Sequence, residues 1–122
     1  ELRNWWTESD REEFEKRTKK LIDQYDNYKV VDGTPVNGEF TQGENIGDLA
    51  GIVIAYKAYQ LSKKGKQPPV IDGLTGDERF FYGWGTIWGV KSTDKQLIRQ
   101  IKTDPHSPGW RSSGRSNKGP YP

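Results

Sequence analysis

Two carboxylates in the segment Gly-Glu-Asn-Ile-Gly-Asp, residues 43–48, have the spacing that a shared site would need. Glu44 and Asp48 lie four residues apart, where a long apolar run begins. If that run is helical, both side chains point from one face, one turn apart. One interpretation is that a helix dipole favours acids near its N-terminus, by about 0.3–1 kcal/mol each. The other is that the two acids are buried, in which case they need a charged partner or a metal ion.

The single histidine of the chain, His106, lies far downstream between Pro105 and Pro108, with Asp104 close by. Each proline fixes its own φ, so the loop can hold the imidazole with little ordering cost. A histidine in a loop can equally be a polar surface residue. Together with the acidic helix, it suggests the downstream half of a metal hydrolase site. One histidine and one glutamate are too few for a tight zinc site, which takes three protein ligands and a water.

The composition excludes several classes of partner and site. The chain has 122 residues, which is one domain at most, and a net charge of +2 from 19 basic and 17 acidic residues. This mixed balance gives no reason to expect nucleic acid or an anionic membrane as a partner. No apolar run approaches the roughly 18–20 residues that span a bilayer, and the absence of cysteine excludes disulfides and thiolate ligands. The chain opens with neither a signal peptide nor an initiator methionine, which suggests a trimmed product.

The apolar periodicity predicts helices with irregular connections between them. The first helix starts at Thr7, where Asp10 completes a pattern like a capping box. Residues 32–35, Asp-Gly-Thr-Pro, break the helical pattern. Residues 36–41 are too short and too rich in glycine to be more than an extended connector or one small strand.

The second predicted helix, from about residue 44 to residue 64, carries the two acids. Gly47 and Gly51 lie in its interior, where glycine costs about 1 kcal/mol relative to alanine. Their presence on the acidic side predicts the close approach of another helix. Apolar residues cover most of the remaining circumference, so this helix is expected to be buried on nearly all sides.

Two shorter helices follow. The third starts at Thr75 or Asp77, and its glycines again indicate tight contacts, whereas the fourth is capped by Thr93. The inner face of the fourth helix is expected to consist of Leu97, Ile98 and Ile101. After Pro105 no regular period survives. The expected fold class is therefore mainly α, with several helices and little or no strand.

Several motifs of the chain occur together, in one order, in a known family. They are Asn4-Trp5-Trp6-Thr7, Val36-Asn37-Gly38, Thr41, Gly43-Glu44-Asn45-Ile46-Gly47-Asp48, Gly51, Ala55-Tyr56, Ala58-Tyr59, Phe80-Phe81, Trp88 and Thr103-Asp104-Pro105-His106-Ser107-Pro108. On these residues the chain resembles the neprilysin-like zinc endopeptidases, which include endothelin-converting enzymes and bacterial oligopeptidases. The resemblance runs from the first residues to about Asn117, and the glutamate and histidine motifs are its most specific parts.

The resemblance implies a role for five residues. Glu44 matches the third zinc ligand, which joins two histidines of an upstream His-Glu-x-x-His helix that this chain lacks. Asp48 matches the carboxylate that orients one of those histidines. His106 matches the residue that stabilises the oxyanion formed during peptide hydrolysis. Arg111 resembles the arginine that binds a substrate carbonyl, and Trp88 resembles the aromatic residue that lines the pocket beyond the scissile bond.

The resemblance also implies what the whole protein is. Residues 1–122 would be the C-terminal segment of a gluzincin-type (thermolysin-like) catalytic domain, inactive alone and a poor binder of zinc. The complete enzyme would be a zinc metalloendopeptidase that hydrolyses short peptides with one Zn²⁺ per site, and its partner here would be the upstream part of the same polypeptide. Missing family cysteines suggest a bacterial member, either in the cell envelope or in the cytoplasm. The alternatives are a non-catalytic binding or assembly module without zinc, or a different ion held by Glu44, Asp48 and His106.

Overall fold

The computed structural model describes residues 3–109, and the regular structure of that part is helical. Its four helices are α1 (Glu8–Asp26), α2 (Gly38–Ser62), α3 (Gly76–Ile87) and α4 (Asp94–Thr103). The β pairing within the described residues is limited to two isolated antiparallel bridges, Lys29 with Pro35 and Ile71 with Leu74. The prediction of a mainly α chain is therefore confirmed. No helix within residues 3–109 is both long and apolar enough to cross a bilayer.

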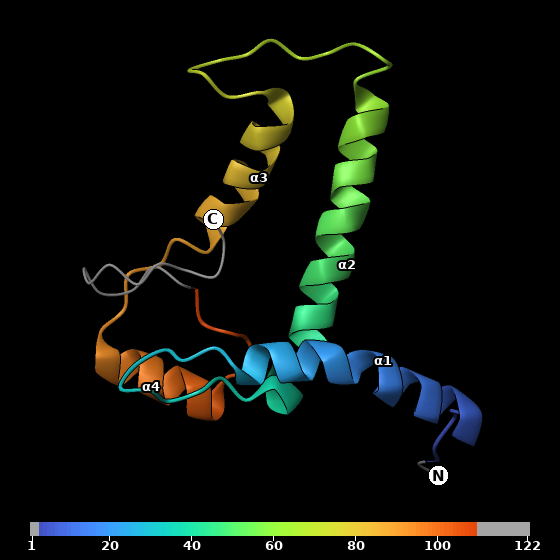
Figure 1. Ribbon diagram of the computed structural model, residues 1–122, viewed down its shortest axis with the longest axis vertical. Coiled ribbons are helices and arrows are strands. Elements are labelled where there is room, and N and C mark those ends of the chain that lie inside the picture. The colour runs from blue at the N-terminus through green and yellow to red at the C-terminus, as the bar shows by residue number, and fades with distance from the viewer. Residues whose placement is uncertain (1–2, 110–122) are drawn as a thin grey trace.

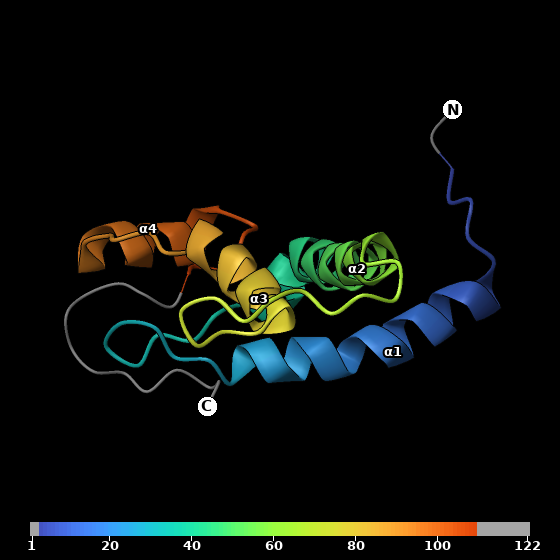
Figure 2. The ribbon, with the colours of Figure 1, turned by 90° about the horizontal axis from the view of Figure 1, so that it is seen from above.

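The helices form two regions that share α2, as Figure 1 shows. The base consists of α1, α4 and α2 residues 38–48. The arm consists of α2 residues 49–62 together with α3, which returns beside α2 after a loop at the far end of the arm (Figure 1). Seen from above, α1 runs along one side of α2 while α4 lies toward the other (Figure 2).

Each helix begins at a side chain that accepts a hydrogen bond from a backbone N–H three residues ahead. Such capping satisfies one of the donors that the first helical turn leaves without an intrahelical partner. At α3 the cap is reciprocal, because Glu78 also accepts from the backbone of Thr75. The sequence predicted the caps at Thr7 and Thr93, and it gave Thr75 as one of two starts for α3. The four capping residues are Thr7, Asn37, Thr75 and Thr93.

The start of α2 differs from the prediction by six residues. The helix begins at Gly38, so the expected extended connector over residues 36–41 is wrong for residues 38–41. The Asn37 side chain accepts from Phe40 N at 2.9 Å, and Gly38 N donates to the Asp26 carboxylate at 2.6 Å. A Cβ at Gly38 would collide with a backbone carbonyl of α1. Glycine is therefore required here by close packing of two helices, and it does not break the helix.

Burial is concentrated in the base. The buried apolar side chains of the described residues are few, and all lie in α4 or in the connection between α1 and α2: Val31, Val36, Leu97 and Ile101. Leu97 and Ile101 confirm two of the three residues expected on the inner face of α4. Thr18, Thr41 and Asn45 are buried polar residues of the same region.

The prediction that α2 is buried on nearly all sides is wrong for this chain. Leu49, Val53 and Ile54 are each more than half exposed. A Cβ placed on Gly47 or Gly51 would meet nothing within 4 Å. No described residue makes the close helix contact that these glycines predicted, so the apolar surface of α2 is open within this chain.

Aromatic rings and one carboxylate join α2 to α3 in the arm. Tyr59 stacks on Phe80 with ring centroids 5.3 Å apart, and Tyr56 lies 5.0 Å from Phe81. Asp77 of α3 accepts hydrogen bonds from two side chains of α2 and from the C-cap residue of that helix, Lys63. The donors and their distances are Tyr56 at 2.9 Å, Gln60 at 3.2 Å and Lys63 at 3.0 Å.

Glycine requirements differ along α3. A Cβ at Gly76 would collide with the Tyr59 hydroxyl and Pro68, which confirms a tight contact at the start of the helix. Gly89, just beyond the helix, also lies close to the carbonyl of Thr86. Gly83 and Gly85 face open space, so the tight contacts predicted for the helix interior are not made by the described residues.

Candidate metal and catalytic site

Glu44 and Asp48 lie in the interior of α2 because that helix begins at Gly38. The acid in the first turn of α2 is Glu39, so the dipole interpretation does not apply to Glu44 and Asp48. The side chain of Glu44 is 49% exposed, and Asp48 is half-buried. The predicted one-turn spacing on a helix is thus confirmed, and full burial of the acids is not.

His106 lies in the loop that follows α4. The carboxylate of Asp104, at the end of that helix, is hydrogen-bonded to this loop. Asp104 has an extended backbone, as expected for a residue that precedes a proline. Its Oδ1 accepts both from the backbone N–H of His106 at 2.9 Å and from the ring Nδ1 at 2.8 Å. These two hydrogen bonds, the backbone one foremost, hold the pKa of Asp104 below its usual value. The imidazole is therefore fixed at Nδ1 by its own loop.

The other ring nitrogen of His106 points to the acidic helix. His106 Nε2 lies 3.1 Å from Glu44 Oε2, so the two motifs recognised separately in the sequence form one site. The pKa of His106 is raised, first by the hydrogen bond to Asp104 and then by the negative charges of Glu44, Asp104 and Asp48, against a lowering effect of partial burial. A histidine with a carboxylate at each nitrogen holds its second proton to higher pH than a free imidazole does.

Asp48 is the third member of the cluster. Partial burial and the neighbouring charge of Glu44 raise the pKa of Asp48, and the charge of His106 opposes that shift. A cation brought to this face would favour the ionised carboxylates. The charge arrangement therefore suits a positive ligand on the acidic face of α2.

A chain of polar side chains lies directly beside this cluster. Ser107 Oγ donates to Asn45 Oδ1 at 2.9 Å, and Asn45 Nδ2 donates to Thr41 Oγ1 at 2.9 Å. Thr41 donates in turn to the backbone carbonyl of Asn37 at 2.9 Å. Reasoning from the sequence did not assign Asn45 or Ser107 a role. The available signal was their position, since each is the immediate neighbour of a proposed site residue, Glu44 or His106.

Of the two predicted substrate-binding residues, Trp88 and Arg111, the first lies within the described residues. Trp88 is the C-cap of α3, half-buried, and its Nε1 is buried with no hydrogen-bond partner among residues 3–109. A Cβ at Gly109 would collide with the carbonyl oxygen of Trp88, so the chain beyond His106 passes against the end of α3. Within the described residues, no hydrogen bond or ion pair joins Trp88 to Glu44, Asp48 or His106. Arg111 lies outside the described residues.

The donor set fits part of a zinc site. Carboxylate oxygen and imidazole nitrogen are both zinc ligands, and structural and catalytic sites take at least three protein ligands. Among residues 3–109 no group of three or more histidine or acidic side chains is arranged to hold a metal ion. Glu44 presents a half-exposed carboxylate on an open helix face, which suits one ligand of a site that other residues complete.

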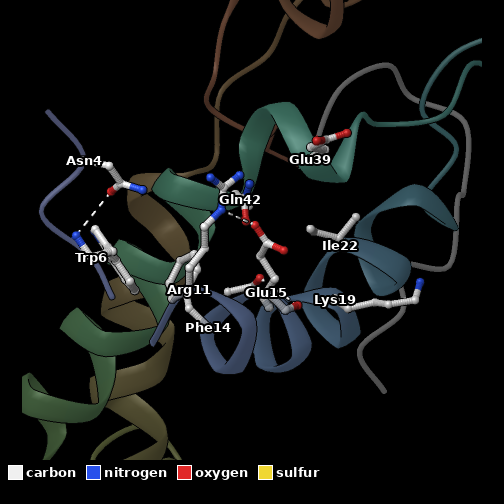
Figure 3. A pocket seen from close by; sticks show the side chains of 10 residues that line it. Asn4, Trp6, Arg11, Phe14, Glu15, Lys19, Ile22, Glu39 and Gln42 are labelled. Atoms are coloured by element: carbon white, nitrogen blue, oxygen red, sulfur yellow. Dashed lines mark hydrogen bonds and ion pairs between the residues drawn. The ribbon is translucent and has the colours of Figure 1, made fainter. Parts of the chain in front are cut away.

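A groove lies away from Glu44 and His106, between the N-terminal segment, α1 and the start of α2 (Figure 3). Its volume is about 910 Å³, and its lining mixes Trp6 and Phe14 with charged residues such as Arg11 and Glu15. Arg11 and Glu15 pair with each other at 2.8 Å. Neither Glu44 nor His106 lines this groove, so it is separate from the candidate site.

Comparison with known proteins yields one family and several relatives. Residues 1–117 match the sequence model of peptidase family M13. Endothelin-converting enzyme 1 of Homo sapiens is 42% identical over 111 residues, which cover 88% of this chain and 14% of that enzyme. Neprilysin-1 of Caenorhabditis elegans is 40% identical over 114 residues, covering 88% of this chain and 15% of that protein. The chain thus spans about a seventh of the length of these relatives.

Solved structures agree with the sequence matches. The crystal structure of the zinc metalloprotease Zmp1 of Mycobacterium tuberculosis, in complex with an inhibitor, superposes with a TM-score of 0.79. Its sequence is 54% identical, and the match covers 88% of this chain and 17% of that one. The TM-score over this coverage shows that the matched part of the two chains shares one fold.

Proposed function

Because the chain belongs to peptidase family M13, we propose that it is the part of a zinc metalloendopeptidase that provides one metal ligand and the oxyanion-stabilising histidine. The resemblance read from the sequence is confirmed by the family match and by the relatives. The observation that carries the proposal is the 3.1 Å approach of His106 Nε2 to Glu44 Oε2. It unites, in one site, the two residues to which the family resemblance assigns complementary roles.

Glu44 would hold the zinc ion through a carboxylate oxygen, together with two histidines of an upstream His-Glu-x-x-His helix. When bound, zinc supplies a Lewis acid that polarises a peptide carbonyl and lowers the pKa of a water molecule. Asp48, one helical turn further along the same face, would accept a hydrogen bond from the outer N–H of one zinc-binding histidine. Such a carboxylate fixes the tautomer and orientation of the imidazole.

His106 would donate a hydrogen bond to the scissile carbonyl oxygen as that oxygen gains negative charge. A donor placed in advance at this position stabilises the transition state more than the ground state. Asp104 occupies Nδ1, so the second proton of the imidazolium lies at Nε2, which faces Glu44. The pKa of His106 is raised, first by its hydrogen bond to Asp104, so the imidazole keeps this second proton to higher pH than a free imidazole does.

The proposed substrate is a peptide, and the proposed partner is the upstream part of the same polypeptide. Trp88 and Arg111 would bind the substrate, as the family resemblance implies. The upstream zinc helix would pack on the face of α2 that carries Gly47 and Gly51, where a Cβ now meets nothing within 4 Å. Exposed Leu49 and Val53 support such packing, because apolar surface of this extent is normally covered.

The test is a pair of substitutions in the full-length protein. Glu44→Ala should abolish zinc retention, measured as metal per protein after dialysis, and with it peptide hydrolysis. His106→Ala should retain zinc but lower kcat by about 10²–10³-fold, the usual effect of removing one oxyanion donor.

Glu39→Ala is the matched control, because Glu39 lies on the same helix, in its first turn. It should change neither zinc content nor turnover. Wild-type zinc content and activity in both site variants would overturn the proposal. A non-catalytic binding module, the alternative, would show no dependence on zinc even when the upstream sequence is present.

A further inference from the structure

Among residues 3–109, one side-chain hydrogen bond joins the loop that carries His106 to the helix that carries Glu44, in addition to the approach of His106 to Glu44 itself. Ser107 Oγ donates to Asn45 Oδ1 at 2.9 Å, although the two residues are 62 positions apart in the sequence. Each residue adjoins a member of the site, since Asn45 follows Glu44 and Ser107 follows His106. The bond therefore spans the same gap as the approach of His106 to Glu44.

Hydrogen bonds at both ends of the amide fix the side chain of Asn45. Asn45 is 4% exposed, and its Nδ2 donates to Oγ1 of Thr41, a residue that is 2% exposed. Thr41 donates to the carbonyl of Asn37, the capping residue of α2. Because the amide nitrogen is committed to Thr41, the amide oxygen faces Ser107. A buried amide with both ends bonded cannot rotate without leaving a polar group unsatisfied.

Within the described residues, the other hydrogen bonds of the histidine loop are made to α4 and inside the loop, and Gly109 packs against the carbonyl of Trp88. Asp104 accepts from His106 N and Nδ1, and Gln100 Nε2 donates to the carbonyl oxygen of His106 at 3.4 Å. These contacts orient the imidazole relative to α4. They do not fix the distance between α4 and α2, which the bond from Ser107 to Asn45 does span.

We propose that Asn45 and Ser107 are positioning residues that set the place of His106 relative to the Glu44 carboxylate. The inference rests on the proposed function, because the gap that they set is the one between the metal ligand and the oxyanion donor. A donor that moves by about 1 Å from a reacting atom can cost up to two orders of magnitude in rate. Both residues would act through His106, without contact to the substrate or the metal.

The test uses the full-length, zinc-loaded protein. Ser107→Ala removes the donor, and Ser107→Thr keeps a hydroxyl on the same carbon. Ser62→Ala is the matched control, because Ser62 also donates one hydrogen bond, to the carbonyl of Tyr59 at the far end of the same helix. Ser107→Ala should lower kcat about tenfold with KM and zinc content unchanged, Ser107→Thr should recover most of the loss, and Ser62→Ala should behave as wild type.

A second readout does not depend on activity. Amide hydrogen exchange at the non-proline residues of 104–109 should become about fivefold faster in Ser107→Ala, which one lost hydrogen bond produces, while residues 97–101 of α4 keep their protection. Faster exchange in the loop with unchanged exchange in α4 is the result expected when the hydrogen bond from Ser107 to Asn45 is lost. General destabilisation would accelerate exchange in both segments, and that result would overturn the proposal.

Other outcomes also decide the question. Wild-type kcat and exchange in Ser107→Ala, or equal losses in Ser107→Thr, would show that the hydroxyl does not position His106. Loss of zinc in Ser107→Ala would likewise contradict a role limited to the histidine. Full activity of Glu44→Ala and His106→Ala would refute the proposed function instead, and the exchange measurement would still report on the hydrogen bond from Ser107 to Asn45 alone.

Discussion

The base and the arm of this chain share one helix, α2, but hold it with different interactions. In the base, α2 lies against α1, and its buried side chains are polar and hydrogen-bonded, as at Thr41 and Asn45. In the arm, α2 meets α3 through aromatic rings and Asp77, and no apolar side chain is fully buried among the described residues of either segment. The base therefore contains the core of this chain, whereas the arm leaves apolar surface exposed within residues 3–109.

The difference shows that apolar content does not locate the core. The second half of α2 is the most apolar part of the sequence, yet the buried apolar residues lie elsewhere. A helix face is buried only where another element reaches it. The site residues Glu44 and Asp48 lie in the base, close to where α2 continues into the open arm.

The largest expected effect tests whether stability resides in the base. Leu97 of α4 is 2% exposed, so Leu97→Ala should cost about 2–5 kcal/mol of unfolding free energy. Leu61→Ala, at a position that is 71% exposed in the arm, should change it by less than about 0.5 kcal/mol. Urea unfolding of the two variants measures both values, and equal losses would contradict the division into base and arm.

A smaller effect is expected where α3 begins, against the end of α2 in the arm. Gly76→Ala would place a Cβ against the Tyr59 hydroxyl and Pro68, and overpacking of this kind costs about 1–3 kcal/mol. Gly83→Ala lies in the same helix but faces open space, so it should be neutral or stabilising by up to about 1 kcal/mol. Thermal unfolding compares the pair. A stable Gly76→Ala variant would mean that α2 and α3 are not closely packed at this end.

The open face of the arm can be tested by one substitution in two contexts. In this chain, Gly51→Ala should stabilise α2 by about 1 kcal/mol, because no atom opposes the new methyl group and alanine favours the helix. In the complete protein the proposed zinc helix would pack there, and the same substitution should be destabilising. Unfolding measurements on both forms decide this point, and stabilisation in both would indicate that nothing packs closely at Gly51.

The smallest effects should come from pH, and the two regions should respond to pH changes of opposite direction. Hydrogen bonds from Lys63 and Tyr56 lower the pKa of Asp77, so its contribution is present above the ordinary carboxyl pKa and is lost as pH falls through the lowered value. Asp104 and Glu44 raise the pKa of His106, so that contribution is complete below the ordinary imidazole pKa and is lost as pH rises through the raised value.

Nuclear magnetic resonance can follow each region separately, through the rings of Phe80 and Phe81 for the arm and the imidazole of His106 for the base. The arm signals should change as pH falls through the lowered pKa of Asp77, and the histidine signals should change as pH rises through the raised pKa of His106. Asp77→Asn should remove the first response and leave the second. A histidine that titrates below the ordinary imidazole pKa would contradict the proposed carboxylate environment.

The candidate site was only partly predictable from local pattern. The spacing of Glu44 and Asp48 on a helix follows from their separation of four residues, and the resemblance to the family assigned their roles together with that of His106. Asn45 and Ser107 belong to the motifs that carry the resemblance but received no role from the sequence, because their hydrogen bond joins segments 62 positions apart. The roles of Trp88 and Arg111 remain predictions.

The sequence by itself determined the four helices, because helix formation depends on near neighbours: capping side chains such as Thr7 and Thr93, and apolar residues that repeat with the helical period. Only the tertiary structure decided where α2 begins, since Gly38 becomes helical against the backbone of α1 and the carboxylate of Asp26. It also decided which apolar faces are covered and that His106 meets Glu44. These features depend on contacts between distant segments, which the local pattern of residues does not encode.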